Sequence, residues 1–187
     1  MAERIVTPTF RIAWPWLFEP RPSKYAPRFE ITMLFDKTSD LTWFREAFAA
    51  ESMLGFPNGY PATAANPVAD GDQHDRLQFP GHNVIQARTA ANAAAPAVVG
   101  PDLQPITDPG RIYGGCYCNA NVSLVAYNAG GNQGVSIYLN AVQFVRDGER
   151  FEGAGQSTGF EVIGQATPAQ PPAAAPATGS PEFDLPF

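Results

Sequence analysis

The chain has 187 residues, 44% of them hydrophobic and 12% aromatic, which is enough apolar material for the core of one domain with appendages. No apolar run approaches the ~20 residues of a membrane span, the first ten residues lack the apolar stretch of a signal peptide, and two cysteines do not imply a disulfide framework. The composition predicts a soluble intracellular protein, and its net charge of −6 argues at first against a nucleic-acid partner.

The first part of the chain predicts two strands separated by a loop. Residues 4–14 are rich in β-branched and aromatic residues, with Pro8 suggesting an edge or a bulge. Residues 15–27 contain four prolines and are predicted to form a loop. Residues 28–35 predict a half-buried strand, because apolar side chains alternate along one of its sides: Phe29, Ile31, Met33 and Phe35.

One helix is predicted, over residues 39–54. Ser39 or Asp40 can cap the free amides at its start, and Gly55 and Pro57 end it. The apolar residues of this segment recur at helical spacing: Leu41, Phe44, Ala47 and Phe48.

The second half predicts one further strand and a long hairpin. Two long loops, residues 55–82 and 90–110, flank a strand at 82–89. Residues 115–149 then form two β-type runs around "NAGGNQG", whose adjacent glycines permit the positive φ that hairpin turns require. This pattern predicts an antiparallel hairpin.

Together these elements predict a mainly β protein: an OB-fold-like antiparallel barrel of five or six strands, with one inserted α-helix and a disordered C-terminal tail. Residues 1–160 are expected to form the barrel domain and residues 161–180 a flexible Ala/Pro linker, because this segment has almost no apolar bulk and little charge. Residues 181–187, "PEFDLPF", form an acidic-aromatic tip.

The sequence predicts neither an enzyme nor a cofactor. It contains no P-loop, no GxSxG, no HExxH and no Rossmann glycine pattern after a strand. Cys116 and Cys118 lie two apart on a predicted strand and so share a face, but no nearby residues complete a zinc site. They are interpreted as buried structural thiols.

One cluster resembles a divalent-metal site. "DGDQHD" brings together Asp70, Asp72, His74 and Asp75, whose oxygens could hold Mg²⁺ for phosphodiester hydrolysis. The segment lacks the ligand spacing of a known metal loop, and an acidic, solvated turn built on Gly71 is the favoured interpretation.

Aromatic and basic residues interleave near the start of the chain, which is the pattern that single-stranded nucleic acid requires for stacking and phosphate contacts. Residues 1–28 hold five Arg or Lys against two Glu, whereas residues 152–187 hold four acidic residues and no Arg or Lys. Trp16 and Tyr25 are expected to be exposed and Phe29 to lie in the core. The candidate DNA contacts of this group are Arg11, Trp14, Trp16, Arg21, Lys24, Tyr25 and Arg28.

A second group of candidates lies on the predicted hairpin and before it. Tyr117 and Tyr127 are an even number of residues apart, so on a regular strand they share a face. Arg88 could add a phosphate contact, although a solvated surface charge explains it equally well. The further candidates are Arg111 and Tyr113. For any single ring, core packing explains the residue as well as a base contact does.

These residues carry a resemblance to a known family. "GCYCNANVSLVAYNAGGNQGVSIYLNAVQFVRDGE", with "DPGRIYGG" before it and "IVTPTFRIAWPWLFEP" and "FEITMLFDKTSDL" upstream, closely resembles phage single-stranded-DNA-binding proteins with an OB-fold. The likeness covers about residues 4–152. It implies a protein that coats and protects single strands during phage replication and recombination, without catalysis, in the cytoplasm of the infected bacterial host.

The last residues carry a second resemblance. "DLPF" is similar to the "DIPF"-type ending of bacterial single-stranded-DNA-binding proteins, which recruits replication and repair enzymes. The likeness implies that phage or host replication and recombination proteins dock on Phe183, Asp184, Leu185, Pro186 and Phe187. The tip carries only Glu182 and Asp184 as acids, so docking is favoured over competition with DNA.

Two other functions stay open at this point. One is a metal-dependent nuclease that uses Asp70, Asp72 and Asp75, and the other is a protein-only adaptor that presents the tail. The sequence predicts no membrane partner, and it leaves self-association on DNA open.

Overall fold

The computed structural model describes residues 3–24, 26–129 and 131–151, and the elements below refer to them. Their order along the chain is β1 (Ile5–Val6), β2 (Phe10–Arg21), β3 (Arg28–Asp36), α1 (Thr42–Gly55), β4 (Val68–Asp70), η1 (Gly71–Gln73), β5 (His82–Ala90), β6 (Ala97–Val99), η2 (Pro109–Arg111), β7 (Tyr117–Ala129) and β8 (Asn132–Arg146). None of the described helices has the length and apolar character that crossing a membrane requires.

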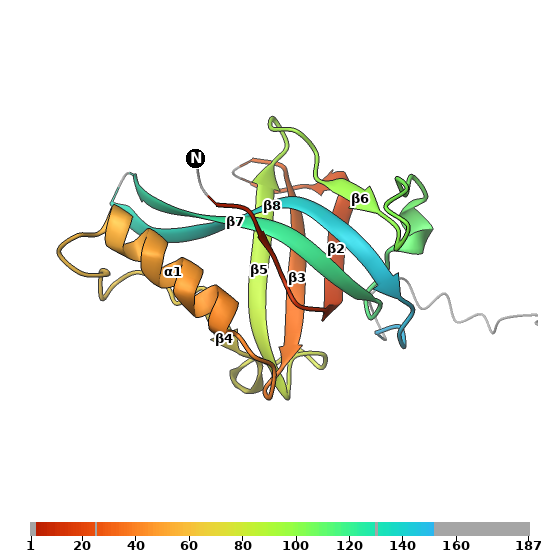
Figure 1. Ribbon diagram of the computed structural model, residues 1–187, viewed down its shortest axis with the longest axis horizontal. Helices are drawn as coiled ribbons and strands as arrows, with labels where there is room; N and C mark the ends of the chain where they lie inside the picture. Colours follow the sequence, from red (N-terminus) through yellow and green to blue (C-terminus); the bar gives the residue numbers. More distant parts are fainter. Residues whose placement is uncertain (1–2, 25, 130, 152–187) are drawn as a thin grey trace, which may run out of the picture. The chain divides into compact units, whose positions relative to one another are not determined.

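Five of these strands close into a ring. β2 pairs with β3, β3 with β5, β7 with β8, and β7 with β2, all antiparallel, while β5 meets β8 in a parallel pair at Arg88 and Tyr138. This order is that of the five-stranded Greek-key barrel of the OB-fold. The predicted mainly β, OB-fold-like barrel with one helix is therefore confirmed (Figure 1).

The described part differs from the prediction in its number of strands and in two pairings. β1, β4 and β6 lengthen the sheet beyond the ring, so the described residues hold eight strands rather than five or six. β4 and β6 lie within segments predicted to be loops, because a strand of three residues is too short to show a hydrophobic period. The pairings β5–β8 and β6–β8 are parallel, whereas an antiparallel barrel was expected.

The interior of the ring is apolar. Alternate side chains of each strand point inward, and Ile31, Met33, Ile85 and Ala87 are completely buried there. Cys116 and Cys118 belong to the same core, with their Sγ atoms 3.7 Å apart and no exposed surface. Their prediction as buried structural thiols is confirmed.

β2 runs through a segment that was predicted to be a loop because of its prolines. Its pairing with β3 breaks between Ala13 and Trp16, and Trp14 in this break has a φ of 44°. A second break lies between Trp16 and Arg21. Proline is tolerated in a strand at such bulges, where the ladder does not need its missing N–H group. The loop between β2 and β3 is therefore limited to residues 22–27.

β3 is buried on both sides, although its alternation predicted a half-buried strand. Phe29 lies in the core as expected. On the opposite side, Thr32 and Leu34 are also almost fully buried. Leu34 belongs to a second, smaller core in which Phe79 covers the outer side of the barrel.

The predicted helix and hairpin are both confirmed. Asp40 Oδ1 accepts the N–H of Thr42 at 2.8 Å at the start of α1, and Glu51 Oε1 accepts the N–H of Ala126 on β7 at 3.1 Å. The free end of the β7–β8 hairpin lies over α1 (Figure 1). The helix therefore supports the hairpin arm where it extends beyond the barrel.

Candidate nucleic-acid interface

The outward-facing side of β3 and β5 is the part of the barrel on which polar and charged side chains gather. Gln86 and Arg88 alternate with buried neighbours on β5 and are exposed. Gln86 lies opposite Thr32 on β3, and Arg88 lies opposite Glu30. Residues that are directly opposite in a ladder share a face. We call this surface, with the ends of β2 that adjoin it, the β3–β5 face.

A buried carboxylate organises two arginines on this face. Glu30 is only 6% exposed, and its Oε1 accepts a hydrogen bond from Arg21 Nη1 at 2.7 Å. Its Oε2 accepts one from Arg28 Nε, also at 2.7 Å. Arg88 lies opposite Glu30 and has no hydrogen bond or ion pair to any residue in the described ranges. Two guanidinium groups thus bind one carboxylate and a third lies on the neighbouring strand opposite it, which leaves the centre of the face positive.

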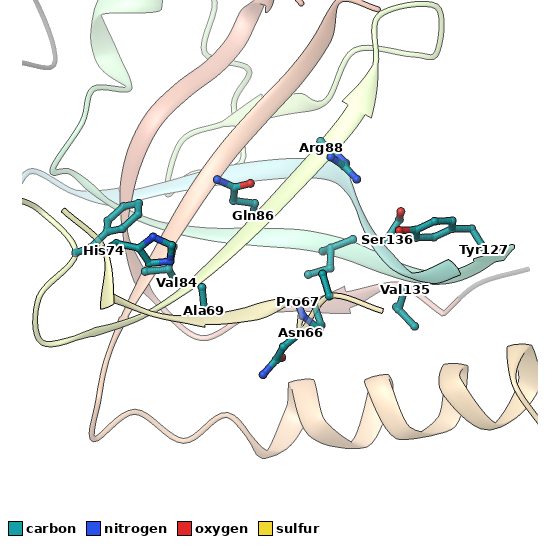
Figure 2. A pocket seen from close by; sticks show the side chains of 14 residues that line it. Asn66, Pro67, Ala69, His74, Val84, Gln86, Arg88, Tyr127, Val135 and Ser136 are labelled. Carbon is teal, nitrogen blue, oxygen red and sulfur yellow. The ribbon is translucent and has the colours of Figure 1, made fainter. Parts of the chain in front are cut away.

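A pocket of about 300 Å³ continues the β3–β5 face toward the hairpin. Figure 2 shows Gln86 and Arg88 on β5 along one side and Tyr127 and Ser136 on the hairpin along the other. Asn66, just before β4, lies on the side toward α1. The pocket exists because β5 pairs with β4 over its first half and reaches β8 only at Arg88, so the two partner strands diverge.

Tyr127 presents an aromatic side chain to this pocket. It is 37% exposed and lies opposite Gly134, where an added Cβ would come within 3.1 Å of the tyrosine hydroxyl. The absence of a side chain at Gly134 gives the ring room across the neighbouring strand. Gly131, at the hairpin turn, has a φ of 83°, as the predicted turn requires.

The two tryptophans of β2 have different surroundings. Trp16 lies opposite Glu30 and is 38% exposed, in agreement with the prediction of an exposed ring. Trp14 instead packs edge-on against Phe79, with ring centroids 5.4 Å apart, and Arg76 stacks on it at 4.6 Å. Trp14 lies in the break of the β2–β3 ladder, beside the smaller outer core, whereas Trp16 lies where the pairing resumes.

Four other candidate residues lie at the opposite end of β7 and make contacts within the protein. Arg11 Nη2 donates to the carbonyl of Glu149 at 2.8 Å, and Arg111 pairs with Asp147 at 3.6 Å. Arg146 stacks on Tyr117 at 3.4 Å. The Tyr113 hydroxyl donates to Asp147, and burial raises the pKa of this tyrosine.

The two tyrosines of β7 lie far apart. Tyr117 and Tyr127 are both on the outward-facing side of the strand, but ten residues at ~3.3 Å each separate them by about 33 Å. The structure therefore brings together Trp16, Arg21, Arg28, Arg88 and Tyr127. It places Tyr117 away from this set, whereas Tyr113 lines a pocket beside Trp16.

The remaining candidates belong to a loop and to the chain end. Lys24 is exposed in the loop between β2 and β3, and along the chain it lies between the two arginines that bind Glu30. Tyr25 lies outside the described residues, and so do the tip residues Phe183, Asp184, Leu185, Pro186 and Phe187.

Three residues of the interface were not predicted from the sequence. Glu30 was assigned to a strand. Arg28 lies two residues before it on β3 and so shares its face, whereas only the β2–β3 register brings Arg21 to it. Gln86 was assigned only to its strand. Tyr138 is 44% exposed and lies opposite Arg88 through the parallel β5–β8 pair. A parallel contact of this kind leaves no local signal in the sequence.

The acidic cluster has a cationic partner that the sequence did not reveal. Lys37 Nζ contacts Asp70 Oδ1 and lies 3.2 Å from Asp72 Oδ2. The hydrogen bond to Asp70 raises the pKa of Lys37, and the Gly81 N–H, at 2.6 Å, lowers the pKa of Asp72. A lysine between these carboxylates occupies the place that a divalent cation would need. The cluster is a structural turn, and it does not provide the metal site that the nuclease hypothesis requires.

Comparison with known proteins connects this geometry to a family. The family model described as Enterobacter phage Enc34, ssDNA-binding protein, matches residues 3–167. A protein of Acyrthosiphon pisum secondary endosymbiont phage 1, described as putative protein p50, is 32% identical over 159 residues, and the match covers 78% of this chain and 84% of that protein.

Solved structures share the fold. The single-stranded-DNA-binding protein from bacteriophage Enc34 in complex with ssDNA has a TM-score of 0.67 at 22% identity, over 79% of this chain and 89% of that one. The single-stranded-DNA-binding protein gp2.5 of bacteriophage T7 has a TM-score of 0.56 at 16% identity, over 89% of this chain and 100% of that one.

Proposed function

The chain belongs to the phage Enc34 family of ssDNA-binding proteins, and from this premise we propose that it binds single-stranded DNA across the β3–β5 face, largely without sequence preference. The observation that carries the proposal is the row of Tyr127, Arg88, the Glu30 cluster and Trp16, in which three guanidinium groups lie between two exposed rings. In OB-folds, the second and third barrel strands bind oligonucleotides together with the loops that join strands one and two and strands four and five. Here those strands are β3 and β5.

Two physical terms supply the affinity. Guanidinium groups neutralise phosphates and release the cations condensed on the strand, so binding weakens as salt rises. Exposed rings stack on bases and contribute ~1–3 kcal/mol per base. Since every base has a face to stack and the guanidinium groups act on phosphates, sequence preference is weak. The net charge of −6 does not oppose this, because the positive charge is local to the face.

A gel shift tests the proposal directly. The full chain and a chain lacking residues 165–187 are each mixed with labelled oligo(dT), with and without an excess of unlabelled strand. We expect both proteins to retard the strand and the unlabelled competitor to release it. Unchanged mobility with both proteins would contradict DNA binding and leave the protein-only adaptor as the remaining reading.

We further propose that the protein protects single strands during phage replication and recombination in the cytoplasm of the infected host. The tip then recruits phage or host proteins of these processes. The aromatic and acidic side chains of the tip are groups that a pocket with apolar and basic side chains on another protein can capture. Deleting Leu185–Phe187 should leave the gel shift unchanged. When this chain is immobilised, the deletion should abolish its retention of phage or host replication and recombination proteins. Retention of the same proteins by the truncated chain would contradict recruitment by the tip.

A further inference from the structure

A second pocket, of about 400 Å³, lies beside Trp16 at the β2 end of the β3–β5 face. It is bounded on one side by Trp14, Pro15 and Trp16 of β2 and on the other by the turn that begins at Pro109 and by Arg150. Its position makes it the continuation of the row of exposed rings and guanidinium groups on the far side from Tyr127.

The backbone of β2 departs from regular geometry where it lines this pocket. Trp14 has a φ of 44°, which is unfavourable for a bulky residue, and it precedes a proline that restricts it further. The bulge at this point turns Trp16 outward at the mouth of the pocket while Trp14 packs on Phe79. Bulges of this kind re-aim side chains beside binding sites.

The opposite wall carries a positive charge in a fixed place. The guanidinium group of Arg150 lies 3.9 Å from the centre of the Tyr113 ring, and the Tyr113 hydroxyl is held by Asp147 and by the carbonyl of Gly148, both at 3.0 Å. Arg150 has no ion pair with a carboxylate among the residues that the structure describes. Within the described residues, the pocket is thus lined by an aromatic side chain, Trp16, and by a cation, Arg150, that has no carboxylate partner.

We propose that one nucleobase leaves the row of stacked bases and enters this pocket, where it packs against the Trp16 ring. The adjoining phosphate contacts the guanidinium group of Arg150. The inference rests on the proposed function and adds to it the place where one end of the bound strand is fixed. The walls that the base would touch are mainly ring and proline carbons, so the pocket accepts any base. The pairing of one ring with one cation matches one nucleotide and its phosphate.

An abasic scan tests the pocket. The shortest oligo(dT) that binds with full affinity is used, so that the strand cannot slide, and one thymine at a time is replaced by an abasic residue. We expect one position near one end to weaken binding about 5- to 150-fold, the range of one lost stacking interaction. In the variants Trp16→Ala and Gly110→Phe, an abasic residue at that position should no longer weaken binding relative to the intact strand.

Gly110→Phe separates the pocket from simple stacking on Trp16, because it fills the space and leaves the indole in place. A Cβ at Gly110 meets only the carboxylate of Asp108, at 3.2 Å, whose Oδ1 accepts the Gly110 N–H at 2.8 Å, so this exposed side chain must shift by a few tenths of an ångström. Tyr127→Ala is the matched control, and it should abolish the effect of a different position. Thermal melting monitored by circular dichroism shows whether each variant is folded. Arg150→Gln serves as a third variant.

The outcomes separate the two proposals. If the wild-type chain does not bind oligo(dT), the proposed function is overturned. If the chain binds but all abasic positions weaken binding equally, the pocket is overturned and the function stands. The same holds if Gly110→Phe and Arg150→Gln leave the sensitive position unchanged.

Discussion

Glu30 binds two of the arginines of the interface and so sets the charge available to DNA. Its carboxylate is almost buried, yet it binds Arg21 and Arg28, which are 47% and 31% exposed. A buried carboxylate is stable only when it is paired, so Glu30 and the arginines depend on each other. The carboxylate also competes with DNA phosphates for the same two guanidinium groups.

Glu30→Gln should therefore change stability and affinity in opposite directions. Loss of the charge-assisted hydrogen bonds should lower the free energy of unfolding by about 1–2 kcal/mol, less than for a buried pair because the arginines are partly exposed. Affinity for oligo(dT) at low salt should rise about fivefold, which corresponds to ~1 kcal/mol of removed repulsion. Urea denaturation and fluorescence anisotropy measure the two effects, with Glu46→Gln on α1 as the control. Weaker binding by Glu30→Gln would contradict this role.

The acidic turn gives a prediction about pH. The Gly81 N–H and Lys37 lower the pKa of Asp72 below its ordinary value of 3.8. A carboxylate whose pKa is lowered by folding contributes its stabilisation above the ordinary pKa, and this is lost as pH falls through the lowered pKa. The Gly81 amide resonance should therefore titrate with a midpoint below 3.8. A midpoint at or above this value would show that the turn does not hold Asp72 as described.

At the scale of elements, α1 and the hairpin form one unit that positions Tyr127. A Cβ at Gly55 would overlap the Cβ of Ala126 on β7, so the glycine permits the close approach of helix and strand. The Glu51 hydrogen bond to the neighbouring backbone fixes the same contact. The hairpin arm is thereby held beside the pocket that Tyr127 and Arg88 share.

Gly55→Ala should lower the free energy of unfolding by about 1–3 kcal/mol, because overpacking forces the helix and the strand apart. It should also weaken DNA binding through displacement of Tyr127. The double variant Gly55→Ala/Ala126→Gly restores the space and should recover both properties. Urea denaturation and anisotropy with oligo(dT) measure them. Equal stability of Gly55→Ala and the wild-type chain would contradict the close contact.

The elements that the sequence predicted well are those with a strong local signal. The helix spacing of Phe44 and Phe48 and the paired glycines of the hairpin needed no tertiary information. β2 was cut short because prolines normally end strands, and only the bulge around Pro15 explains why this one continues. Trp14 and Trp16 could not be told apart for the same reason, since Trp14 lies in a break of the ladder that the sequence does not show.

At the scale of the molecule, the interface depends on contacts between distant segments. Arg88 is placed between Glu30 and Tyr138 by an antiparallel and a parallel pairing, and neither is visible in the sequence near Arg88. The resemblance to phage proteins identified the fold and the ligand class. It could not separate Arg88 from Arg111, which the structure pairs with Asp147.

The salt dependence of binding tests the central claim most directly. Fluorescence anisotropy of labelled oligo(dT) is measured at several salt concentrations for the wild-type chain, for Arg88→Gln, and for Arg45→Gln on α1, which removes the same charge away from the face. Each phosphate contact contributes about −0.7 to the slope of log K against log salt for a single strand. The slope should become less steep by about 0.7 in Arg88→Gln and stay unchanged in Arg45→Gln. A wild-type affinity that is independent of salt, or an unchanged slope in Arg88→Gln, would contradict DNA binding at the β3–β5 face.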